Sequence, residues 1–572
     1  MMAPFSSAFL RRDSKAAPFL PADYRDAEAR RAQVQRLAQR PLPVSPAVWS
    51  ELSAQQALLG HSPARAANLD ALRQPGTVAV VSGQQLGLFL GPLYTFYKAA
   101  TAIELARSIE QEHGVRCVPI FWLQTEDHDF EEIRHCHLPL FAGEGDPEGL
   151  TLSLSDEAVA AASLHGAPSD RQSVEHRVLG PEITDLLDRL REALGGLPFA
   201  ADGIDRFAAH YRPGAALSQA FAGAMASLFA DEGLLFLNPR RAALAKEAAP
   251  IYRLAIAKQA DVAQVLTTRG HDLQRAGFDE QVAVRANTSL FFFHEVATGP
   301  RFRLERQEGS DRWLLPQRPG QPQHALSTAD LLAQLDRDPL CFSTSALLRP
   351  LLQDTLLPTV AYVGGPGEIN YWAQLAPLYQ LFADSLPVQQ PLVVPRARFR
   401  CIDDSTRSLL RKLKLEPTDV ERSREDAIAR AQLRQGPASE AGEAASHSLD
   451  WTTASQALRQ QLLSDVTARM EALAGSEPGM KDALRRTRVS IERNIDRLLR
   501  RYQRLGRERD AVLCQRIDRL QRVLYPQGGP QERHDSLPYY LAKYGLAAFK
   551  DQVFRSLTQL DCGHTAVRDL LL

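Results

Sequence analysis

The 572-residue sequence has little cysteine, no long apolar run and almost no net charge. Its six cysteines lie far apart without a CxxC pair, which favours free thiols in a reducing cytoplasm over a secreted disulfide framework. No stretch approaches the roughly 20 apolar residues of a membrane span, and charges interrupt the N-terminal segment, so no signal peptide is expected. With 67 Lys and Arg against 68 Asp and Glu, no global field would attract nucleic acid or anionic membranes. We therefore expect a cytoplasmic protein without nucleic-acid or membrane partners.

Two apolar runs, residues 77–83 (TVAVVSG) and 117–124 (CVPIFWLQ), are each followed directly by polar residues. A short apolar run that stops at glycine and continues with a 3.6-residue period is typical of a strand, a loop and a helix. Further strands are predicted at residues 233–239 and 357–365. We therefore predict an α/β fold with a Rossmann-like parallel sheet. Its loops should meet at the carboxyl edge, where such folds bind ligands.

The first loop begins at Gly83 and continues through Gln84 and Gln85, with Lys98 on the helix expected to follow. It matches neither GxGxxG nor a Walker loop. Backbone N–H groups at a helix start bind anions, and glycine lets a phosphate or carboxylate approach closely. Glycines at a strand end can instead serve close packing. Both interpretations stay open.

The second loop places four ionisable residues directly after a strand, namely Glu126, Asp127, His128 and Asp129. Neighbouring carboxylates raise one another's pKa, and a histidine among them can exchange protons near neutral pH. The cluster therefore indicates acid–base catalysis. As an alternative, Asp127 or Asp129 could cap a helix that starts near residue 130.

A metal site is a second alternative for this region, because His128, His135, Cys136 and His137 offer nitrogen and sulfur ligands. Residues 135–137 look extended, however, and successive side chains of an extended segment point to opposite faces. We therefore predict no metal.

The third loop follows the strand at residues 357–365 and carries Glu368 and Tyr371 after a GGPG turn. Glu368 could bind an amine, and Tyr371 could donate to an oxyanion. Arg349 precedes this strand and could pair with a phosphate or carboxylate through two parallel hydrogen bonds. The same residues could also form an ordinary turn with a surface arginine nearby.

The chain is expected to divide into three parts. Residues 1–400 would form the core, with an inserted antiparallel lobe at about 281–316, where short alternating segments occur. Residues 401–525 would form a helical coiled-coil arm, because apolar residues recur at steps of three and four within 458–473 and 480–524. The segment AGSEPG at 474–479 would reverse the chain. Residues 526–572 would form helices that pack back on the core.

Four segments carry a resemblance to a known family: SGQQLGLFLGPLYTFYKA, PIFWLQTEDHDFEEI, LRPLLQDTLLPTVAYVGGPGEINYW, and QER after PQGGP. In this order they resemble hallmark segments of the bacillithiol-biosynthesis cysteine-adding enzyme family. The resemblance extends from PFLPADYRD near the N-terminus to the C-terminus. It implies a Rossmann-type core related to the nucleotidyl-transferase and class I aminoacyl-tRNA synthetase group. It also implies a homodimer formed through the coiled coil.

The function implied by the resemblance is a cysteine ligase. Family members are assigned the last step of bacillithiol synthesis, which joins cysteine by an amide to the amino group of glucosaminyl malate. ATP or ADP is the candidate cofactor, although this chain has neither the HIGH nor the KMSKS signature of synthetases. A nucleotide site is expected at Gln531, Glu532 and Arg533, with a surface salt bridge as the alternative.

The resemblance and the loops together suggest specific roles. His128 or Asp127 would remove the amine proton, and Asp129 would orient His128. Substrate would be bound by eight residues: Gly83, Gln84, Gln85, Lys98, Glu126, Arg349, Glu368 and Tyr371. Gly83 to Gln85 would hold an anionic group, and Glu368 and Tyr371 would bind an amine. Arg349 or Lys98 would pair with the malate or phosphate charge. The alternatives are another ATP-dependent ligase or nucleotidyl transferase acting on a small amine, and a non-enzymatic coiled-coil scaffold with a ligand pocket.

Overall fold

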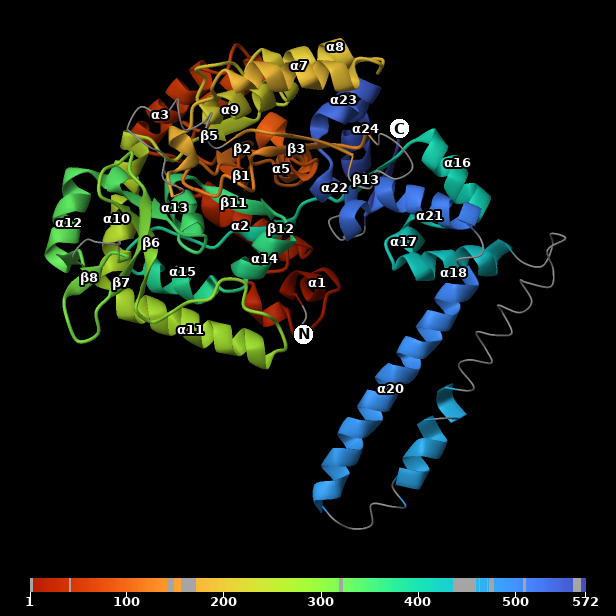
Figure 1. The fold of residues 1–572 in the computed structure, drawn as a ribbon. Helices are drawn as coiled ribbons and strands as arrows, with labels where there is room; N and C mark the ends of the chain where they lie inside the picture. Colours follow the sequence, from red (N-terminus) through yellow and green to blue (C-terminus); the bar gives the residue numbers. More distant parts are fainter. Residues whose placement is uncertain are drawn as a thin grey trace. The chain divides into compact units, whose positions relative to one another are not determined.

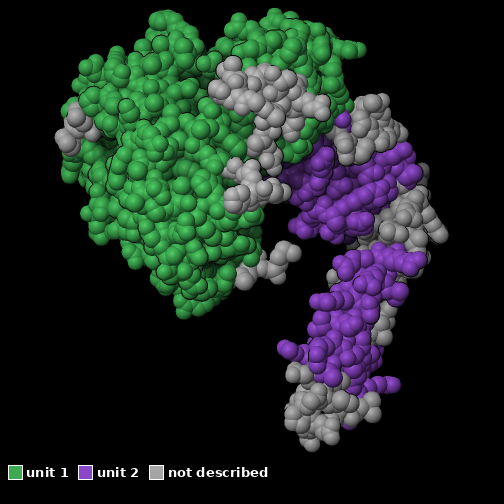
Figure 2. Space-filling view, turned by 60° about the vertical axis from the view of Figure 1, so that its left-hand side comes forward, with its two compact units in different colours: residues 1–140, 150–399, 535–570 green, residues 141–149, 400–534, 571–572 purple. Residues whose placement is uncertain are grey.

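A computed structural model describes residues 4–40, 43–140, 149–155, 171–317, 323–435, 459–461, 463–470, 472, 478–507, 511–558 and 567–572. The chain divides into two compact units (Figure 2). The first comprises residues 1–140, 150–399 and 535–570, and the second comprises residues 141–149, 400–534 and 571–572. The three candidate loops belong to the first unit, whereas Gln531, Glu532 and Arg533 belong to the second.

The first unit is built on a five-stranded parallel sheet (Figure 1), as the sequence predicts. Its strand order is β12 (Leu392–Pro395), β11 (Thr359–Gly364), β1 (Val78–Gln84), β2 (Cys117–Leu123) and β5 (Leu235–Leu237). All neighbouring strands are parallel. From β1 the chain runs outward through β2 to β5 and then returns to β11 on the other side of β1. The topological switch point, where such sheets bind ligands, therefore lies between β1 and β11.

Helices cover this sheet, which explains why its strands read as unbroken apolar runs. All of β2 is buried, and so is β1 up to Gly83. The connecting helix α5 (Tyr94–His113) packs on both strands and ends at Gly114, whose φ of 63° suits glycine. The remaining helices of this unit are α1 (Phe5–Leu10), α2 (Ala27–Ala38), α3 (Pro46–Ala57), α4 (Pro63–Ala71), α7 (Glu182–Leu194), α8 (Ala200–Ala208), α9 (Leu217–Leu228), α10 (Ala242–Ala257), α11 (Gln259–Arg275), α12 (Thr328–Arg337), α13 (Arg349–Leu356), α14 (Pro366–Trp372), α15 (Ala376–Ala383), α23 (Leu537–Tyr544) and α24 (Leu546–Thr558).

The inserted lobe is a five-stranded antiparallel sheet in the order β10, β6, β7, β8, β9. Its strands are β6 (Thr288–His294), β7 (Arg301–Arg306), β8 (Arg312–Leu314), β9 (Ala325–Ser327) and β10 (Phe342–Thr344). The predicted antiparallel region thus forms β6 to β8, and two later strands complete the sheet. The short strand β10 matters most for the site, because Thr344 at its end contacts the loop after β2.

The segment after β2 differs from the prediction. Residues 124–134 form turns and irregular backbone instead of a helix starting near residue 130. They lead into β3 (His135–Leu138), which pairs antiparallel with β4 (Leu150–Ser153). The predicted N-cap role of Asp127 or Asp129 is therefore wrong, since no helix follows to be capped.

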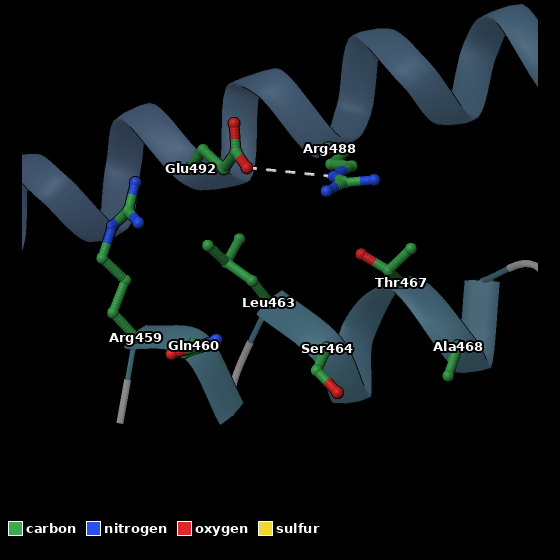
Figure 3. Close-up of a pocket in the computed structure, with 8 residues that line it drawn as sticks. All are labelled: Arg459, Gln460, Leu463, Ser464, Thr467, Ala468, Arg488 and Glu492. Atoms are coloured by element: carbon green, nitrogen blue, oxygen red, sulfur yellow. Dashed lines mark ion pairs between the residues drawn. The ribbon is translucent and has the colours of Figure 1, made fainter. Parts of the chain in front are cut away.

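The second unit is helical, and its longest element is α20 (Pro478–Arg507). The helical residues 459–461 and 463–470 run antiparallel to α20 (Figure 3). Arg459 pairs with Asp496 at 2.7 Å, whereas Thr467 and Ala468 line a groove with Arg488. Residues 474–477 of the predicted reversal lie outside the described residues, and α20 begins at Pro478. The other described elements are β13 (Phe399–Ile402), α16 (Asp404–Leu413), α17 (Pro417–Val420), α18 (Arg424–Gln435), α21 (Ala511–Leu524) and α22 (Gln531–His534). Most of β14 (Arg568–Leu571) belongs to the first unit.

None of the helices in the described part of the chain combines the length and the apolar character needed to span a bilayer.

Candidate active site

A buried ion pair joins the loops after β1 and β11 at the switch point. Lys98 of α5 donates to the Gly83 carbonyl and to Gln84 Oε1, both at 2.8 Å, and pairs with the Glu368 carboxylate. The Lys98 side chain is only 3% exposed, and these contacts occupy its three N–H donors. The structure therefore assigns Lys98 to an internal ion pair rather than to the malate or phosphate charge that the sequence suggested.

Glu368 is likewise saturated by protein groups. Besides Lys98, its carboxylate accepts the Gly365 N–H at 2.8 Å and the Tyr362 hydroxyl, and so closes a capping box at the start of α14. Burial raises the pKa of Glu368. The charge of Lys98 and these hydrogen bonds lower this pKa by more than burial raises it, so the net shift is downward. The expectation that Glu368 binds a substrate amine does not fit this geometry, because the oxygens already have partners.

Arg349 and Tyr371 form a second buried cluster behind this pair. Arg349 donates to Gln353 Oε1 at 2.9 Å and to the Tyr371 hydroxyl at 2.8 Å, and its guanidinium lies over the Tyr362 ring. Arg349 is only 4% exposed. The structure thus corrects the expectation of direct ligand binding: both residues support the loop after β11 from inside the core.

The loop after β2 is held by the antiparallel lobe. Glu126 is buried and accepts hydrogen bonds from the backbone N–H of Thr344, at 3.3 Å, and from its hydroxyl. Its carboxylate therefore anchors the loop to β10 instead of facing substrate. This anchoring fixes the position of the next two residues, Asp127 and His128.

Asp127 and His128 form the centre of the candidate site. Asp127 accepts hydrogen bonds from Gln85 Nε2 at 2.7 Å and from Arg301 Nη1 at 3.2 Å, and its Oδ1 lies 3.4 Å from His128 Nδ1. The side chains of Asp127 and His128 are 35% and 36% exposed, so a ligand can reach them. An imidazole that donates Nδ1–H to a carboxylate keeps its Nε2 lone pair as a proton acceptor.

Asp127 suits the role of an orienting anion better than that of a base. Burial raises its pKa, but the hydrogen bonds from His128 and Gln85 and the charge of Arg301 together lower it well below the ordinary aspartate value. The carboxylate is therefore ionised at neutral pH and is a weak proton acceptor. Of the two predicted bases, the geometry favours His128.

Two further expectations for these loops need correction. Asp129 does not orient His128: its Oδ1 accepts the exposed Glu132 N–H at 3.2 Å, whereas Asp127 contacts the imidazole. Gly83 lies inside β1, and α5 begins only at Tyr94, so no helix N-terminus forms an anion cradle at Gly83 to Gln85. A Cβ on Gly83 would lie 2.6 Å from the Trp122 carbonyl oxygen, which supports the close-packing interpretation.

Arg301, the first residue of β7, is the functional residue that sequence reasoning missed. Its guanidinium is 5% exposed, stacks on Phe292 at 3.8 Å and donates to the Thr344 carbonyl as well as to Asp127. Its Nη1 also lies 3.5 Å from His128 Nδ1. The only sequence signal is an arginine in an alternating strand of the lobe, which does not reveal a partner far away along the chain.

Comparison with protein families supplies the context for this geometry. Residues 2–397 match the family model described as "Bacillithiol biosynthesis BshC, N-terminal Rossmann-like domain", and residues 399–568 match the C-terminal coiled-coil domain of the same family. The chain belongs to the BshC family. The resemblance seen in the loop segments is thereby confirmed, and so is the pairing of a Rossmann-like fold with a coiled coil.

Relatives in the BshC family cover most of the chain. A protein of Koribacter versatilis is 35% identical over 85% of this chain and 83% of its own length. One of Salinibacter ruber is 33% identical over 94% of this chain and 91% of its own length. One of Geobacillus thermodenitrificans is 29% identical over 84% and 82%, respectively. All three carry the name "Putative cysteine ligase BshC".

The segment expected to hold a nucleotide lies within the span of the BshC coiled-coil domain, in the four-residue helix α22. Gln531 is buried, and its amide bonds the backbone N–H and carbonyl of Cys401 and the carbonyl of Val523. Glu532 is buried as well, whereas Arg533 is exposed. Only Arg533 could therefore meet a phosphate, and the buried pair serves packing.

The histidines proposed as alternative metal ligands have other partners in this structure. His135 bonds Ser153 and Glu131, His137 bonds Thr151, and Cys136 points to the opposite, buried face, as expected for a strand. Across the described residues, no group of three or more His, Cys, Asp or Glu side chains could hold a metal ion.

Proposed function

We propose that this chain is a carbon–nitrogen ligase that joins L-cysteine by an amide to the amino group of glucosaminyl malate, as the last step of bacillithiol biosynthesis. Membership of the BshC family and the names of the relatives support the reaction class. The observation that carries the proposal for the site is the contact of His128 Nδ1 with Asp127, at the carboxyl end of β2 and within reach of solvent.

Amide formation joins the amine nitrogen to the carboxyl carbon of an activated cysteine, while one C–O bond of that carboxyl breaks and its oxygen departs with the activating group. The attacking amine loses a proton in the same reaction. In the proposal, His128 takes this proton through Nε2, and Asp127 holds the ring and stabilises the imidazolium that forms. Arg301 acts as a positioning residue, because it fixes Asp127 and the backbone of Thr344 at the same time. Gln85 completes the support of Asp127 from the end of β1.

A nucleotide cofactor, ATP or ADP, stays a prediction. Its expected contacts in α22 fit a phosphate poorly, since Gln531 bonds backbone groups and Glu532 adds negative charge next to the exposed Arg533. No step of the proposed reaction is therefore routed through a nucleotide.

The proposal is tested in a bacterial strain that lacks this protein and is complemented with variants. Bacillithiol and glucosaminyl malate are quantified by mass spectrometry, with protein abundance checked by immunoblotting. We expect the wild type to restore bacillithiol. His128→Ala should let glucosaminyl malate accumulate, because a general base contributes about 10²- to 10⁴-fold to a rate. Asp127→Asn should do the same, since it removes the anion that orients the base.

Asp129→Asn is the matched comparison, because it changes an exposed carboxylate two residues from Asp127 that does not contact the imidazole. We expect it to restore bacillithiol as the wild type does. Normal bacillithiol levels with both His128→Ala and Asp127→Asn would refute the site. An unchanged thiol pool in the uncomplemented strain would refute the substrate and the reaction.

A further inference from the structure

A cavity lies in the first unit beside the end of β2. It has a volume of about 190 Å³ and is lined by α3, by the start of α9 and by the ends of β2 and β5. Both α3 and α9 contact β5, the strand at one edge of the sheet. The polar lining includes His210, Arg212, Ser218, Gln219 and Arg241.

The N-terminus of α9 opens into this cavity. The helix has twelve residues and begins after Ala216, which supplies no side-chain cap. Ser218 and Gln219 lie in its first turn and both line the cavity. The first N–H groups of a helix have no partner within the helix and carry the positive end of its dipole. In α9 the N–H of Leu217 donates to the Arg177 carbonyl, so the N–H groups of Ser218 and Gln219 are the ones that would attract an anion.

Ser218 gives an independent indication of a missing partner. It is only 2% exposed, and its Oγ finds no hydrogen-bond partner among the described residues. A buried hydroxyl without a partner costs free energy that an acceptor in the cavity would recover. The ligand should therefore present an oxygen that accepts a hydrogen bond.

The charged groups around the cavity include both signs. Arg241 pairs with Glu175 at 2.7 Å and lies 3.9 Å from Glu51, so two carboxylates face this arginine. Arg212 is exposed and adds a positive charge close to His210. Burial and the charge of Arg212 lower the pKa of His210, which favours the neutral ring. The positive charge available to an anion therefore comes from Arg212 and the end of α9.

The size of the cavity limits the ligand. Pockets for drug-sized ligands have volumes of about 300–1,000 Å³, and this cavity of about 190 Å³ is smaller. We propose that it binds a small oxyanion, either inorganic phosphate or the carboxylate of a small metabolite, through the Ser218 hydroxyl, the first-turn N–H groups of α9 and Arg212. The residues that line this cavity do not include those of the proposed ligase site, so the proposal does not rest on that site.

Isothermal titration calorimetry on the full chain tests the proposal with three probes: inorganic phosphate, acetate and AMP. We expect saturable binding of phosphate or acetate, and the tighter of the two identifies the source of the oxyanion. Ser218→Ala and Arg212→Gln should each weaken that binding about tenfold, as expected for the loss of one hydrogen bond to a charged group. AMP should bind at least about tenfold more weakly, because the cavity is too small for it.

Gln219→Glu separates binding from folding. A carboxylate in the first turn stabilises a helix, yet it repels an anion at this site, so the variant should stay folded and lose binding. Arg189→Gln, which removes an exposed arginine on α7 away from the cavity, should bind like the wild type. The proposal is overturned if neither phosphate nor acetate binds saturably, if AMP binds most tightly, or if the cavity variants bind as the wild type does.

Discussion

Buried ionisable side chains in the first unit show how strongly the surroundings of a residue determine its charge. Asp354 on α13 is 2% exposed and accepts hydrogen bonds from Gln353 Nε2, at 2.9 Å, and from the Tyr379 hydroxyl. Burial nevertheless raises its pKa to about 6. The folded protein therefore favours the protonated carboxyl more than the unfolded chain does.

This shift predicts a specific dependence of stability on pH. Because the folded pKa of about 6 exceeds the ordinary aspartate pKa of 3.8, the stabilisation is complete below pH 3.8 and is lost as the pH rises through 6. Between pH 5 and 7.5 the wild type should lose roughly 1 kcal/mol of unfolding free energy from this group. Asp354→Asn should lack this loss, whereas Asp384→Asn, at an exposed position, should retain it. Urea unfolding at both pH values measures the difference, and parallel pH profiles for wild type and Asp354→Asn would contradict it.

The sequence indicated which side chains carry useful chemical groups more readily than it indicated which residues those side chains contact. Asp127 and His128 stand out because charge rarely collects at the end of a buried strand. Lys98 and Glu368 also stand out by their chemistry, but the sequence does not show that they bond each other. Arg301 gives no local signal, since its contact with Asp127 exists only after the lobe has packed on the sheet. Pairings across such distances in the chain follow from the fold alone.

The short distance between β1 and β2 explains why β1 requires a glycine at position 83. Gly83 lies opposite Trp122 in the parallel register, and a Cβ at Gly83 would come within 2.6 Å of the Trp122 carbonyl oxygen. The two strands cannot keep their separation around a larger residue. The end of β1, which carries Gln84 and Gln85 into the site, therefore depends on this close approach.

Gly83→Ala should lower the unfolding free energy by about 1–3 kcal/mol, the usual cost of overpacking a well-packed interior. Gly367→Ala is the matched comparison, because a Cβ at Gly367 in α14 meets nothing within 4 Å. That change should be neutral or stabilise by up to about 1 kcal/mol, since alanine favours a helix. Urea midpoints followed by circular dichroism measure both effects. Equal midpoints for the two variants would show that the strands can move apart.

Strands were easier to predict than the segments between them. The apolar runs that form β1, β2, β5 and β11 are bounded by glycine or polar residues. Short, unbroken apolar runs of this kind are typical of strands that are buried on both faces of a sheet. The helix expected after β2 does not form. Glu126 bonds the lobe, and Asp127 and Asp129 accept the backbone N–H groups of His128 and Glu132 within irregular turns. Short strands such as β10 and β12 have three or four residues and too little pattern to be recognised.

For the whole molecule, we propose that the coiled coil forms a homodimer. The helix α20 is thirty residues long and carries exposed apolar side chains, including Leu498, which is 70% exposed, and Val489, which is 40% exposed. Large apolar residues that are exposed on a long polar helix are typical of a helix partner.

Sedimentation analysis over a range of concentrations should show a dimer for the wild type. Leu498→Glu should weaken the dimer at least about tenfold, because a carboxylate would be buried in the contact. Val296→Glu changes an apolar residue that is 61% exposed between β6 and β7, outside the coil, and should leave the dimer intact. A wild type that stays monomeric, or equal dissociation of both variants, would contradict the proposal.

The first unit is discontinuous in sequence, and this has a consequence for how the protein is made. Residues 535–570 belong to it, although they follow the whole of residues 400–534. Asp535 accepts the N–H of Leu93, Ser536 exchanges hydrogen bonds with His137, and the Ala542 carbonyl accepts the N–H of Phe199. On the ribosome, the chain that bears β1, α5 and β3 must therefore wait until the coiled coil has been translated before it gains these contacts. During that interval all five strands of the parallel sheet have been made, but α5 lacks its contact with α24, and it is then that chaperones would have most reason to bind the first unit.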